Sequence, residues 1–203
     1  MPDHSHPLLE HDAAADPLEQ FTTWYGEAAA AVRTPEAMAL ATVASDGQPS
    51  VRMVLLKGWS MQGFVFFTQY RSRKAAELDA SGKAALLFHW DELGRQVRIE
   101  GPVERVSGQE SDEYFATRPF GAQISAHASY QSQVVADRAT LDEIVLQKAE
   151  RYAGGPVPRP ATWGGYRLRP QSFEFWQNRD DRLHDRLRYT PAGDGWRIER
   201  LQP

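Results

Sequence analysis

The sequence predicts a mainly β protein in which a closed or split antiparallel barrel is flanked by helices. Three observations support this fold class. Short apolar runs of strand length recur along the chain, and turn residues such as Asp-Gly separate them. Most of these runs follow one another directly, as in hairpins, instead of alternating with helices as in a parallel sheet. No G-x-G-x-x-G turn occurs, so a doubly wound dinucleotide-binding sheet is not expected.

The chain begins with a stretch that we expect to be a flexible arm, residues 1–15, followed by a single domain over residues 16–203. The arm holds three loosely spaced histidines, which are more typical of solvated side chains than of metal ligands, so we expect no metal site. A helix should follow the arm. Asp16 can cap its first turn, Pro17 suits the first helical position, and apolar residues recur at helical spacing to about Val32.

Strand signals dominate the middle of the chain. Two strand-like runs, 37–45 and 48–57, surround Asp46-Gly47, a strong two-residue hairpin signal, and 58–63 is expected to be a second turn. Further strands are expected at 64–68, 83–90 and 95–106, and further helices at 72–81, from Ser107 to just before Pro119, and at 137–152. After a proline-rich link at 156–160, residues 163–201 predict three or four strands. We expect about seven or eight strands in all.

Composition narrows the function class. The 203 residues are 41% hydrophobic and 25% charged, as in an ordinary globular domain. A net charge of -4 argues against a general nucleic-acid binder, which is usually basic. The lack of cysteine excludes disulfides, thiolate nucleophiles and cysteine metal sites. Neither a secretory signal nor an apolar run of about 20 residues is present, so we expect no membrane segment and a cytoplasmic location.

A cationic stretch runs through this acidic protein. No Asp or Glu lies between Gly47 and Ala76, although the 27 acids of the chain would place about four in a window of this length. The window contains Arg52, Lys57, Arg71, Arg73 and Lys74. Arginine can bind two phosphate oxygens at once, lysine supplies a point charge, and residues 72–74 open a helix whose free N–H groups favour anions. The composition favours an anion site over a solvated surface.

Strand geometry leaves two arrangements open. Arg52 and Lys57 are five residues apart, so they meet one ligand only if their strand bends, ends or lies along the edge of the ligand. If residues 182–188 form a strand, one of its faces carries Arg182, His184, Arg186 and Arg188. These cations need an anionic ligand opposite them, or else neutralisation in surface ion pairs by Asp180, Asp181 and Asp185. The residues alone do not decide between the two.

One segment carries a family resemblance. The run Phe173-Glu174-Phe175-Trp176-Gln177, followed after four residues by Arg182-Leu183-His184-Asp185-Arg186, resembles the C-terminal signature of the pyridoxamine 5′-phosphate oxidase family across fourteen positions. Other segments fit the same family in its order and extend the resemblance over about residues 17–203: 52–57, 72–74, 95–97, 114–115, 118–119 and 131–132.

The resemblance implies an FMN-binding split β-barrel of antiparallel, Greek-key type, assembled as a homodimer with one FMN at each of two subunit-interface sites. It also implies a reaction. Pyridoxamine or pyridoxine 5′-phosphate is oxidised at C4′ to pyridoxal 5′-phosphate, O2 reoxidises the flavin and gives H2O2, and the amine substrate also releases ammonia. The expected partners are therefore these phosphorylated B6 vitamers and O2, with no nucleic acid and no membrane.

Residue roles are carried over from the resemblance, position by position. The FMN phosphate and ribityl chain would contact Arg52, Arg73, Lys74 and Ser132. The flavin would lie along the backbone of Met53, Val54, Leu55 and Leu56 and beside Phe67 and Thr68, and Lys57, Gln96, Gln131, Trp176 and Arg186 would complete the cofactor contacts. The substrate phosphate would contact Lys57, Tyr114 and Arg118. The catalytic candidates Arg182 and His184 would bracket the pyridine ring, with Arg182 guiding orientation and His184 assisting binding or proton movement.

Some positions depart from the family pattern. Residues 1–15 lack the Arg-x-x-Tyr that covers the substrate in many members, Ala122 replaces a serine usual in the substrate-phosphate pocket, and Ser125 and His127 replace a Gly and a Trp. Two other functions stay open. One is an FMN oxidase of phenazine biosynthesis with the same fold and an unphosphorylated substrate, and the other is a non-catalytic split-barrel protein that binds flavin or haem. The presence of Lys57, Tyr114 and Arg118 favours a phosphorylated substrate.

Overall fold

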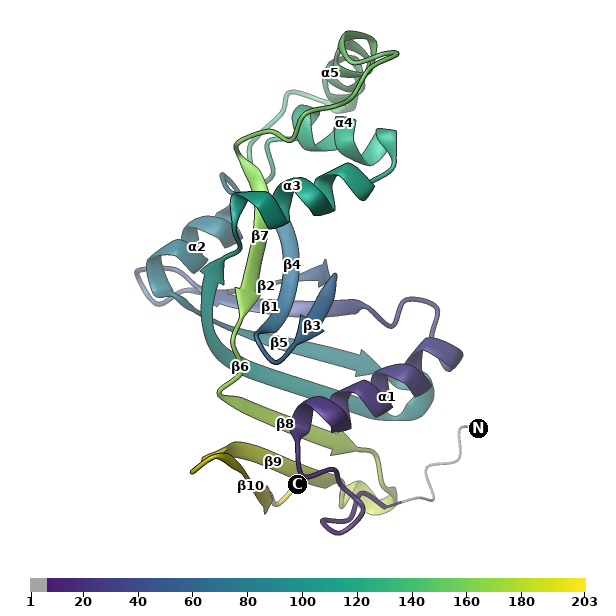
Figure 1. The fold of residues 1–203 in the computed structure, drawn as a ribbon, viewed down its shortest axis with the longest axis vertical. Helices are drawn as coiled ribbons and strands as arrows, with labels where there is room; N and C mark the ends of the chain where they lie inside the picture. Colours follow the sequence, from purple (N-terminus) through teal and green to yellow (C-terminus); the bar gives the residue numbers. More distant parts are fainter. Residues whose placement is uncertain (1–6) are drawn as a thin grey trace.

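The computed structural model describes residues 7–203, and in this part of the chain ten strands form one curled antiparallel sheet, a half-barrel (Figure 1). The strands are β1 (Ala37–Val43), β2 (Pro49–Leu55), β3 (Gly58–Ser60), β4 (Gly63–Gln69), β5 (Lys83–Trp90), β6 (Arg95–Arg105), β7 (Trp163–Leu168), β8 (Ser172–Gln177), β9 (Asp185–Ala192) and β10 (Gly195–Arg200). The main path runs β10-β9-β8-β6-β5-β1-β2, and β4 joins it through β7, with β3 beside β4.

Strand β6 is the corner at which the sheet divides. Its first part pairs with β5 and β8, whereas Val103 to Arg105 pair with β7. Gly101 lies between the residues of β6 that pair with β8 and those that pair with β7. A Cβ on Gly101 would lie 1.9 Å from the carbonyl oxygen of Arg169, so only glycine allows the two segments to approach this closely. The bend separates β7, β4 and β3 from the main path.

Five helices flank the sheet in the described residues: α1 (Pro17–Ala31), α2 (Arg73–Ser81), α3 (Gly108–Thr117), α4 (Phe120–Ala128) and α5 (Arg138–Arg151). Four of them begin where the sequence predicts. At those four starts the side chain of Asp16, Ser72, Ser107 or Asp137 accepts a hydrogen bond from a backbone N–H of the first turn. No helix among the described residues is long and apolar enough to cross a membrane.

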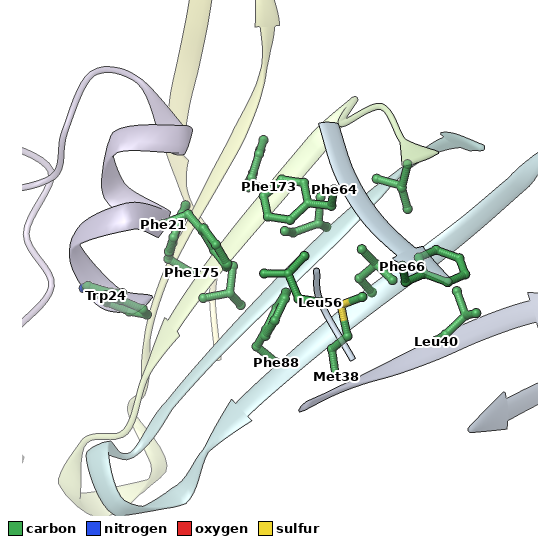
Figure 2. Close-up of a cluster of buried hydrophobic side chains, with 14 of the residues drawn as sticks. Phe21, Trp24, Met38, Leu40, Leu56, Phe64, Phe66, Phe88, Phe173 and Phe175 are labelled. Atoms are coloured by element: carbon green, nitrogen blue, oxygen red, sulfur yellow. The ribbon is translucent and has the colours of Figure 1, made fainter. Parts of the chain in front are cut away.

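The core forms where α1 packs against the sheet (Figure 2). Phe21 on α1 is fully buried, and its ring centre lies 4.9 Å from that of Phe64 on β4 and 5.1 Å from that of Phe88 on β5. Trp24, one turn later, makes an edge contact with Phe175 on β8. Replacing a buried aromatic residue by alanine costs about 3–5 kcal/mol, so this packing fixes α1 relative to both parts of the sheet.

The structure confirms the mainly antiparallel split-barrel prediction and corrects it at two places. Residues 58–63 are more than a turn, because Gly58–Ser60 forms β3 against β4, and ten strands replace the expected seven or eight. Helix α4 is absent from the sequence prediction. Pro119 at its N-cap position offers no side-chain hydrogen bond, so no capping signal marks its start.

Part of the expected arm lies on the C-terminal strands. Leu8 is buried, and its N–H donates to the Asp185 carboxylate over 3.1 Å. Arg200 on β10 donates to both carboxylate oxygens of Glu10 over 2.8 Å and to the carbonyl of Leu8. This section of the arm is held in place by polar contacts. Residues 1–6 lie outside the described residues, so the boundary between arm and domain stays a prediction.

Candidate active site

A cavity of about 240 Å³ opens beside β2, β4 and α3. It is lined by Met53, Val54, Leu55, Lys57, Phe67, Thr68, Lys74, Tyr114, Arg118, Gln131 and Trp163, which we call the cavity group. All of them except Trp163 are site residues predicted from the sequence. Trp163 carries no charge and is not part of the short motifs that carry the family resemblance, so its place in the cavity became visible only in the folded structure.

The cavity group contains three cations, and none of its described members is an acid. Desolvation lowers the pKa of Lys74, and the nearby charge of Arg52 lowers it further. Desolvation also lowers the pKa of Arg118, whose Nη1 is buried without a hydrogen-bond partner among the described residues. A buried, unpaired cation costs free energy until an anion binds beside it. The cavity therefore suits a negatively charged ligand.

One wall of the cavity is a stack of aromatic rings. Phe67 on β4 lies nearly parallel to Tyr114 on α3, with 4.1 Å between ring centres, and to Trp163 on β7 at 5.3 Å. The Arg118 guanidinium lies 4.6 Å above the Trp163 ring. Burial raises the pKa of Tyr114, so its hydroxyl stays protonated near neutrality and can donate a hydrogen bond to an anion.

A hydrogen-bonded cluster connects the start of α2 to the loop after α4. Gln131 accepts hydrogen bonds from Thr68 and Lys74, each over 3.0 Å. Ser132 has a left-handed backbone, with φ at 71°, and its hydroxyl accepts from the N–H of Arg73 over 3.2 Å. The structure thus brings together most of the predicted contacts of the FMN phosphate and ribityl chain.

Two predicted phosphate ligands, Arg52 on β2 and Arg73 on α2, share a carboxylate to which the sequence analysis gave no role. Glu77 is 4% exposed. Its Oε2 accepts from Arg52 Nη2 over 3.1 Å, and its Oε1 accepts from Arg73 Nε over 2.7 Å. A signal was present in the sequence, because Glu77 is the first acid after the cationic stretch and follows Arg73 by four residues, the spacing of paired helical side chains.

Strand β2 offers its backbone to the cavity. It ends the main path of the sheet, so along one edge its N–H and C=O groups have no strand partner in the described part of the chain. Met53 and Leu55 have exposed side chains, whereas Leu56 points into the core and can face a ligand only through its backbone. Strand β2 ends at Leu55, so the alternation of side chains along a strand does not determine where Lys57 points. Lys57 lines the cavity, and Arg52 contacts Glu77 instead.

A second set of predicted residues lies on β6, β8 and β9. Gln96 pairs with Trp176, and Trp176 pairs with Arg186, so the three form one row across the strands. Arg186 Nε donates to Glu174 over 2.8 Å, which raises the pKa of Arg186. Arg98 contacts the same carboxylate. We define the C-terminal group as Gln96, Trp176, Arg182, His184 and Arg186.

Arg182 and His184 lie in the loop before β9, not on a strand. Asp181 and Arg182 have φ at 57° and 60°, which interrupts extended geometry. The His184 ring centre lies 4.6 Å from that of Trp176, and its Nδ1 accepts from the Arg179 N–H over 3.2 Å. In a neutral ring this hydrogen bond leaves the proton on Nε2, which can donate to a ligand.

The arginines of β9 are neutralised, but not by the nearby aspartates. Arg186 pairs with Glu174 on β8, and Arg188 pairs with Glu199 on β10. Asp185 contacts Arg200 instead. Both acidic partners lie on neighbouring strands, so the charges within residues 180–188 alone could not have predicted these ion pairs. No group of three or more His, Asp or Glu side chains in residues 7–203 could hold a metal ion.

The cavity group and the C-terminal group lie apart in one chain. Figure 1 places α3 and α4 toward one end of the long axis, β4 near the middle, and β8 with β9 toward the other end. In the sheet, β2 and β8 are four strand positions apart, which at about 4.8 Å per position is a path of roughly 19 Å along the curled sheet. No member of the C-terminal group lines the cavity. The structure therefore gathers most of the predicted residues into two separate groups, two candidate half-sites.

Comparison with known proteins identifies the family. Residues 26–147 match a family model described as pyridoxamine 5′-phosphate oxidase, and residues 163–203 match the pyridoxine 5′-phosphate oxidase C-terminal dimerisation region. A Bordetella pertussis relative named pyridoxine/pyridoxamine 5′-phosphate oxidase is 56% identical over 201 residues, covering 97% of this chain and 93% of the relative. A relative of the same name from Rubrobacter xylanophilus is 53% identical, with 97% and 91% covered.

Solved structures agree in fold. PhzG from Burkholderia lata 383, in complex with tetrahydrophenazine-1-carboxylic acid, aligns with a TM-score of 0.89 at 35% identity, covering 97% of this chain and 98% of that one. A pyridoxamine 5′-phosphate oxidase-related, FMN-binding protein from Nostoc punctiforme aligns with a TM-score of 0.75 at 16% identity, covering 94% and 100%. Fold and cavity define a split-barrel protein with a cationic cavity. The chain belongs to the pyridoxamine 5′-phosphate oxidase family, a family of oxidoreductases.

Proposed function

We propose that this chain is an FMN-dependent oxidase that converts pyridoxamine 5′-phosphate and pyridoxine 5′-phosphate to pyridoxal 5′-phosphate with O2. One observation carries the proposal. Lys57, Tyr114 and Arg118 line the same cavity as Lys74 and the edge of β2. Two anionic groups, one on the cofactor and one on the substrate, suit a cavity with three cations and no acid among its described lining residues. Relatives that are more than half identical carry the name of this activity.

The residues present fit FMN and a phosphorylated substrate. Arg52, Arg73, Lys74 and Ser132 would bind the FMN phosphate at the start of α2. The ring system would lie along the free edge of β2, whose N–H and C=O groups can bond the polar edge of a flavin. The buried Nη1 of Arg118 lacks a partner that a phosphate oxygen of the substrate would supply.

The protein would contribute mainly position and charge. When bound, FMN supplies the redox chemistry by taking a hydride from C4′ and passing the two electrons to O2, which leaves as H2O2. Lys57, Tyr114 and Arg118 hold the substrate phosphate and so fix where C4′ lies. His184 donates from Nε2 to a substrate heteroatom, and Arg182 orients the pyridine ring. For the amine substrate, water then displaces ammonia.

The two half-sites would meet in a homodimer. Within one chain no residue of the C-terminal group lines the cavity, so one substrate would not contact both groups there. A dimer that places the C-terminal group of one chain over the cavity of its partner completes two equivalent sites. The match of residues 163–203 to a dimerisation region supports this arrangement. An exposed apolar row on β2 supports it as well, formed by Val51, Met53 and Leu55.

A phenazine-type oxidase is the main alternative, because PhzG shares the fold at 35% identity. Its bound ligand, tetrahydrophenazine-1-carboxylic acid, has a carboxylate and no phosphate. The complete Lys57, Tyr114 and Arg118 set in the cavity favours a phosphorylated substrate. A non-catalytic flavin or haem binder would have no use for Arg182 and His184.

The purified protein should be yellow and should release FMN on denaturation. With either vitamer in air, it should form pyridoxal 5′-phosphate and H2O2 in equal amounts, measured by aldehyde absorbance and by a peroxidase-coupled assay. Protein with FMN fully bound that turns over neither vitamer would overturn the proposal. Turnover of a tetrahydrophenazine carboxylate instead would support the alternative. Unchanged oxidation after Arg182→Ala with His184→Ala would remove the catalytic assignment.

A further inference from the structure

We infer that Glu77 is a positioning residue for the cofactor phosphate: it holds the guanidinium groups of Arg52 and Arg73 in one fixed arrangement and sets the net charge that the phosphate meets. The inference rests on the proposed FMN site and adds a residue that does not itself touch the cofactor. Glu77 lies on α2, Arg52 on β2 and Arg73 at the start of α2. One carboxylate thus connects the two elements that would surround the phosphate.

The contacts of Glu77 form a closed network. Its Oε2 accepts hydrogen bonds from the hydroxyls of Thr42 and Ser50 and from Arg52 Nη2. Both hydroxyls in turn accept from the Arg52 guanidinium, whose Nη1 also donates to the Leu40 carbonyl. Arg52 therefore has little freedom to rotate. Orientation of this kind lowers the entropy lost when a ligand binds.

Arg73 is held in a different way. Only its Nε donates to Glu77, over 2.7 Å, and the side chain is 56% exposed. In the described residues its two terminal nitrogens make no hydrogen bond, so this edge of the guanidinium can bind phosphate oxygens. Glu77 thus fixes one edge of Arg73 and leaves the other edge for a ligand.

The charges also match. Arg52, Arg73 and Lys74 bring three positive charges together, and Glu77 removes one, which leaves a net charge of about +2. A phosphate monoester carries about −1.5 to −2 near neutral pH. Burial alone would raise the pKa of Glu77, but the hydrogen bonds that it accepts outweigh burial and lower the pKa to about 2. The carboxylate therefore stays ionised wherever the enzyme works.

The test compares FMN with riboflavin, which has the same ring and ribityl chain but no phosphate. Flavin-free protein is titrated with each ligand, and fluorescence quenching gives both dissociation constants. Glu77→Gln should weaken FMN binding about tenfold or more and change riboflavin binding less than about twofold. The effect of Glu77→Gln on FMN binding should shrink in an Arg73→Ala background, because the residue acts through the arginines.

Asp79→Asn is the matched control. Asp79 lies on the same helix and also binds an arginine, Arg105, together with the Tyr166 hydroxyl, but it lies outside both half-sites. This substitution should lower thermal stability without changing the ratio of the two dissociation constants. If Glu77→Gln does not fold, Glu77→Asp carries the same test, since its shorter side chain cannot reach both guanidinium groups.

Two results would overturn the inference: equal weakening of FMN and riboflavin by Glu77→Gln, or FMN binding that is unchanged or tighter. Either result leaves the proposed function intact, provided that the unaltered chain binds FMN more tightly than riboflavin. An unaltered chain that binds neither flavin would instead contradict the proposed function.

Discussion

The cavity group and the C-terminal group hold their cations in opposite ways. In the cavity, Lys57, Lys74 and Arg118 share a described lining without acids, and desolvation lowers the pKa of Lys74 and of Arg118. In the C-terminal group, Arg186 donates to the buried Glu174, and this hydrogen bond raises the pKa of Arg186. The described lining of the cavity offers its cations no acidic partner, whereas Arg186 in the C-terminal group has one within the chain.

The difference separates residues that bind an anion from residues that give the site its shape. Desolvated cations without a partner raise the free energy of the empty protein, and ligand binding recovers that cost. A cation that already donates to a buried carboxylate gains less from a second anion, so it acts mainly through its position. We therefore expect changes in the cavity group to alter ligand affinity and changes in the C-terminal group to alter geometry and rate.

The largest expected effect tests whether the two groups of different chains form one site. One variant carries Lys57→Ala with Arg118→Ala, the other carries Arg182→Ala with His184→Ala, and each alone should be nearly inactive. After unfolding and refolding together, the mixture should recover about one quarter of the unaltered activity, because half of the dimers are mixed and each mixed dimer has one intact site.

A mixture of two preparations that both carry cavity substitutions is the control for this experiment and should stay inactive. If the first mixture also stays inactive although mixed dimers form, the two groups do not cooperate across an interface. The separation within one chain would then need another explanation.

The next effect concerns Arg118. Replacing it by methionine removes a charge-assisted contact of about 1.5–3 kcal/mol, so KM for pyridoxamine 5′-phosphate should rise roughly 10- to 150-fold. FMN affinity should change little. Steady-state kinetics and flavin titration separate the two effects. Arg169→Met, an exposed arginine paired with Glu104, is the matched control and should leave KM unchanged. A KM effect no larger than in the control would mean that Arg118 does not face the substrate phosphate.

Local signals predicted most of the elements, because they depend only on neighbours in the sequence. The caps at Asp16 and Ser107 and the Asp46-Gly47 hairpin all form where expected. The residues of the cavity were predicted from the family resemblance, and the structure gathers ten of them around one space. Their roles stay predictions.

What the sequence could not show depends on contacts between distant segments. Glu77 meets Arg52 across 25 residues, and no local pattern marks that pair. Left-handed backbone at Asp181 and Arg182 takes the catalytic candidates off the strand, and no local sequence pattern predicted that conformation. The separation of the two candidate half-sites follows from strand order, which pairs β6 with β8 across a long connection.

Acid stability tests whether the hydrogen bonds of Glu77 keep its carboxylate ionised in the folded protein. Folding lowers the pKa of Glu77 from 4.5 to about 2, so its stabilising contribution is complete above pH 4.5 and is lost as pH falls toward 2. The unaltered chain should lose about 2 kcal/mol of unfolding free energy over this range that Glu77→Gln does not lose. Urea unfolding at pH 6 and pH 3 measures the difference. Parallel losses in both proteins would contradict the assignment.

A smaller effect is expected at Glu174. Glu174→Gln keeps the size of the side chain but removes the negative charge that Arg186 and Arg98 share. The row of side chains formed by Gln96, Trp176 and Arg186 should therefore shift. We expect kcat to fall about tenfold and KM to change little. The reason is that the rate depends on the exact placement of the residues around the reacting atoms, so a small displacement lowers it. Arg188 and Glu199 form a similar pair one step along β9, and Glu199→Gln serves as the control. A rise in KM with constant kcat would show that the C-terminal group binds instead of positioning.

The smallest expected effect is a gain at Ala122, in the first turn of α4 and four residues after Arg118. A serine there is usual in the family, and its hydroxyl could donate to the same phosphate. One such hydrogen bond contributes about 0.5–1.5 kcal/mol, so Ala122→Ser should lower KM for pyridoxamine 5′-phosphate roughly 2- to 10-fold at constant kcat.

Ser125→Ala on the same helix is the control for Ala122→Ser, because the Ser125 hydroxyl donates to the Gly121 carbonyl and not into the cavity. If Ala122→Ser leaves KM unchanged, the three cations of the cavity already satisfy the phosphate oxygens. In that case the cavity would depend on charge alone, and the loss of the serine would have cost this chain little affinity.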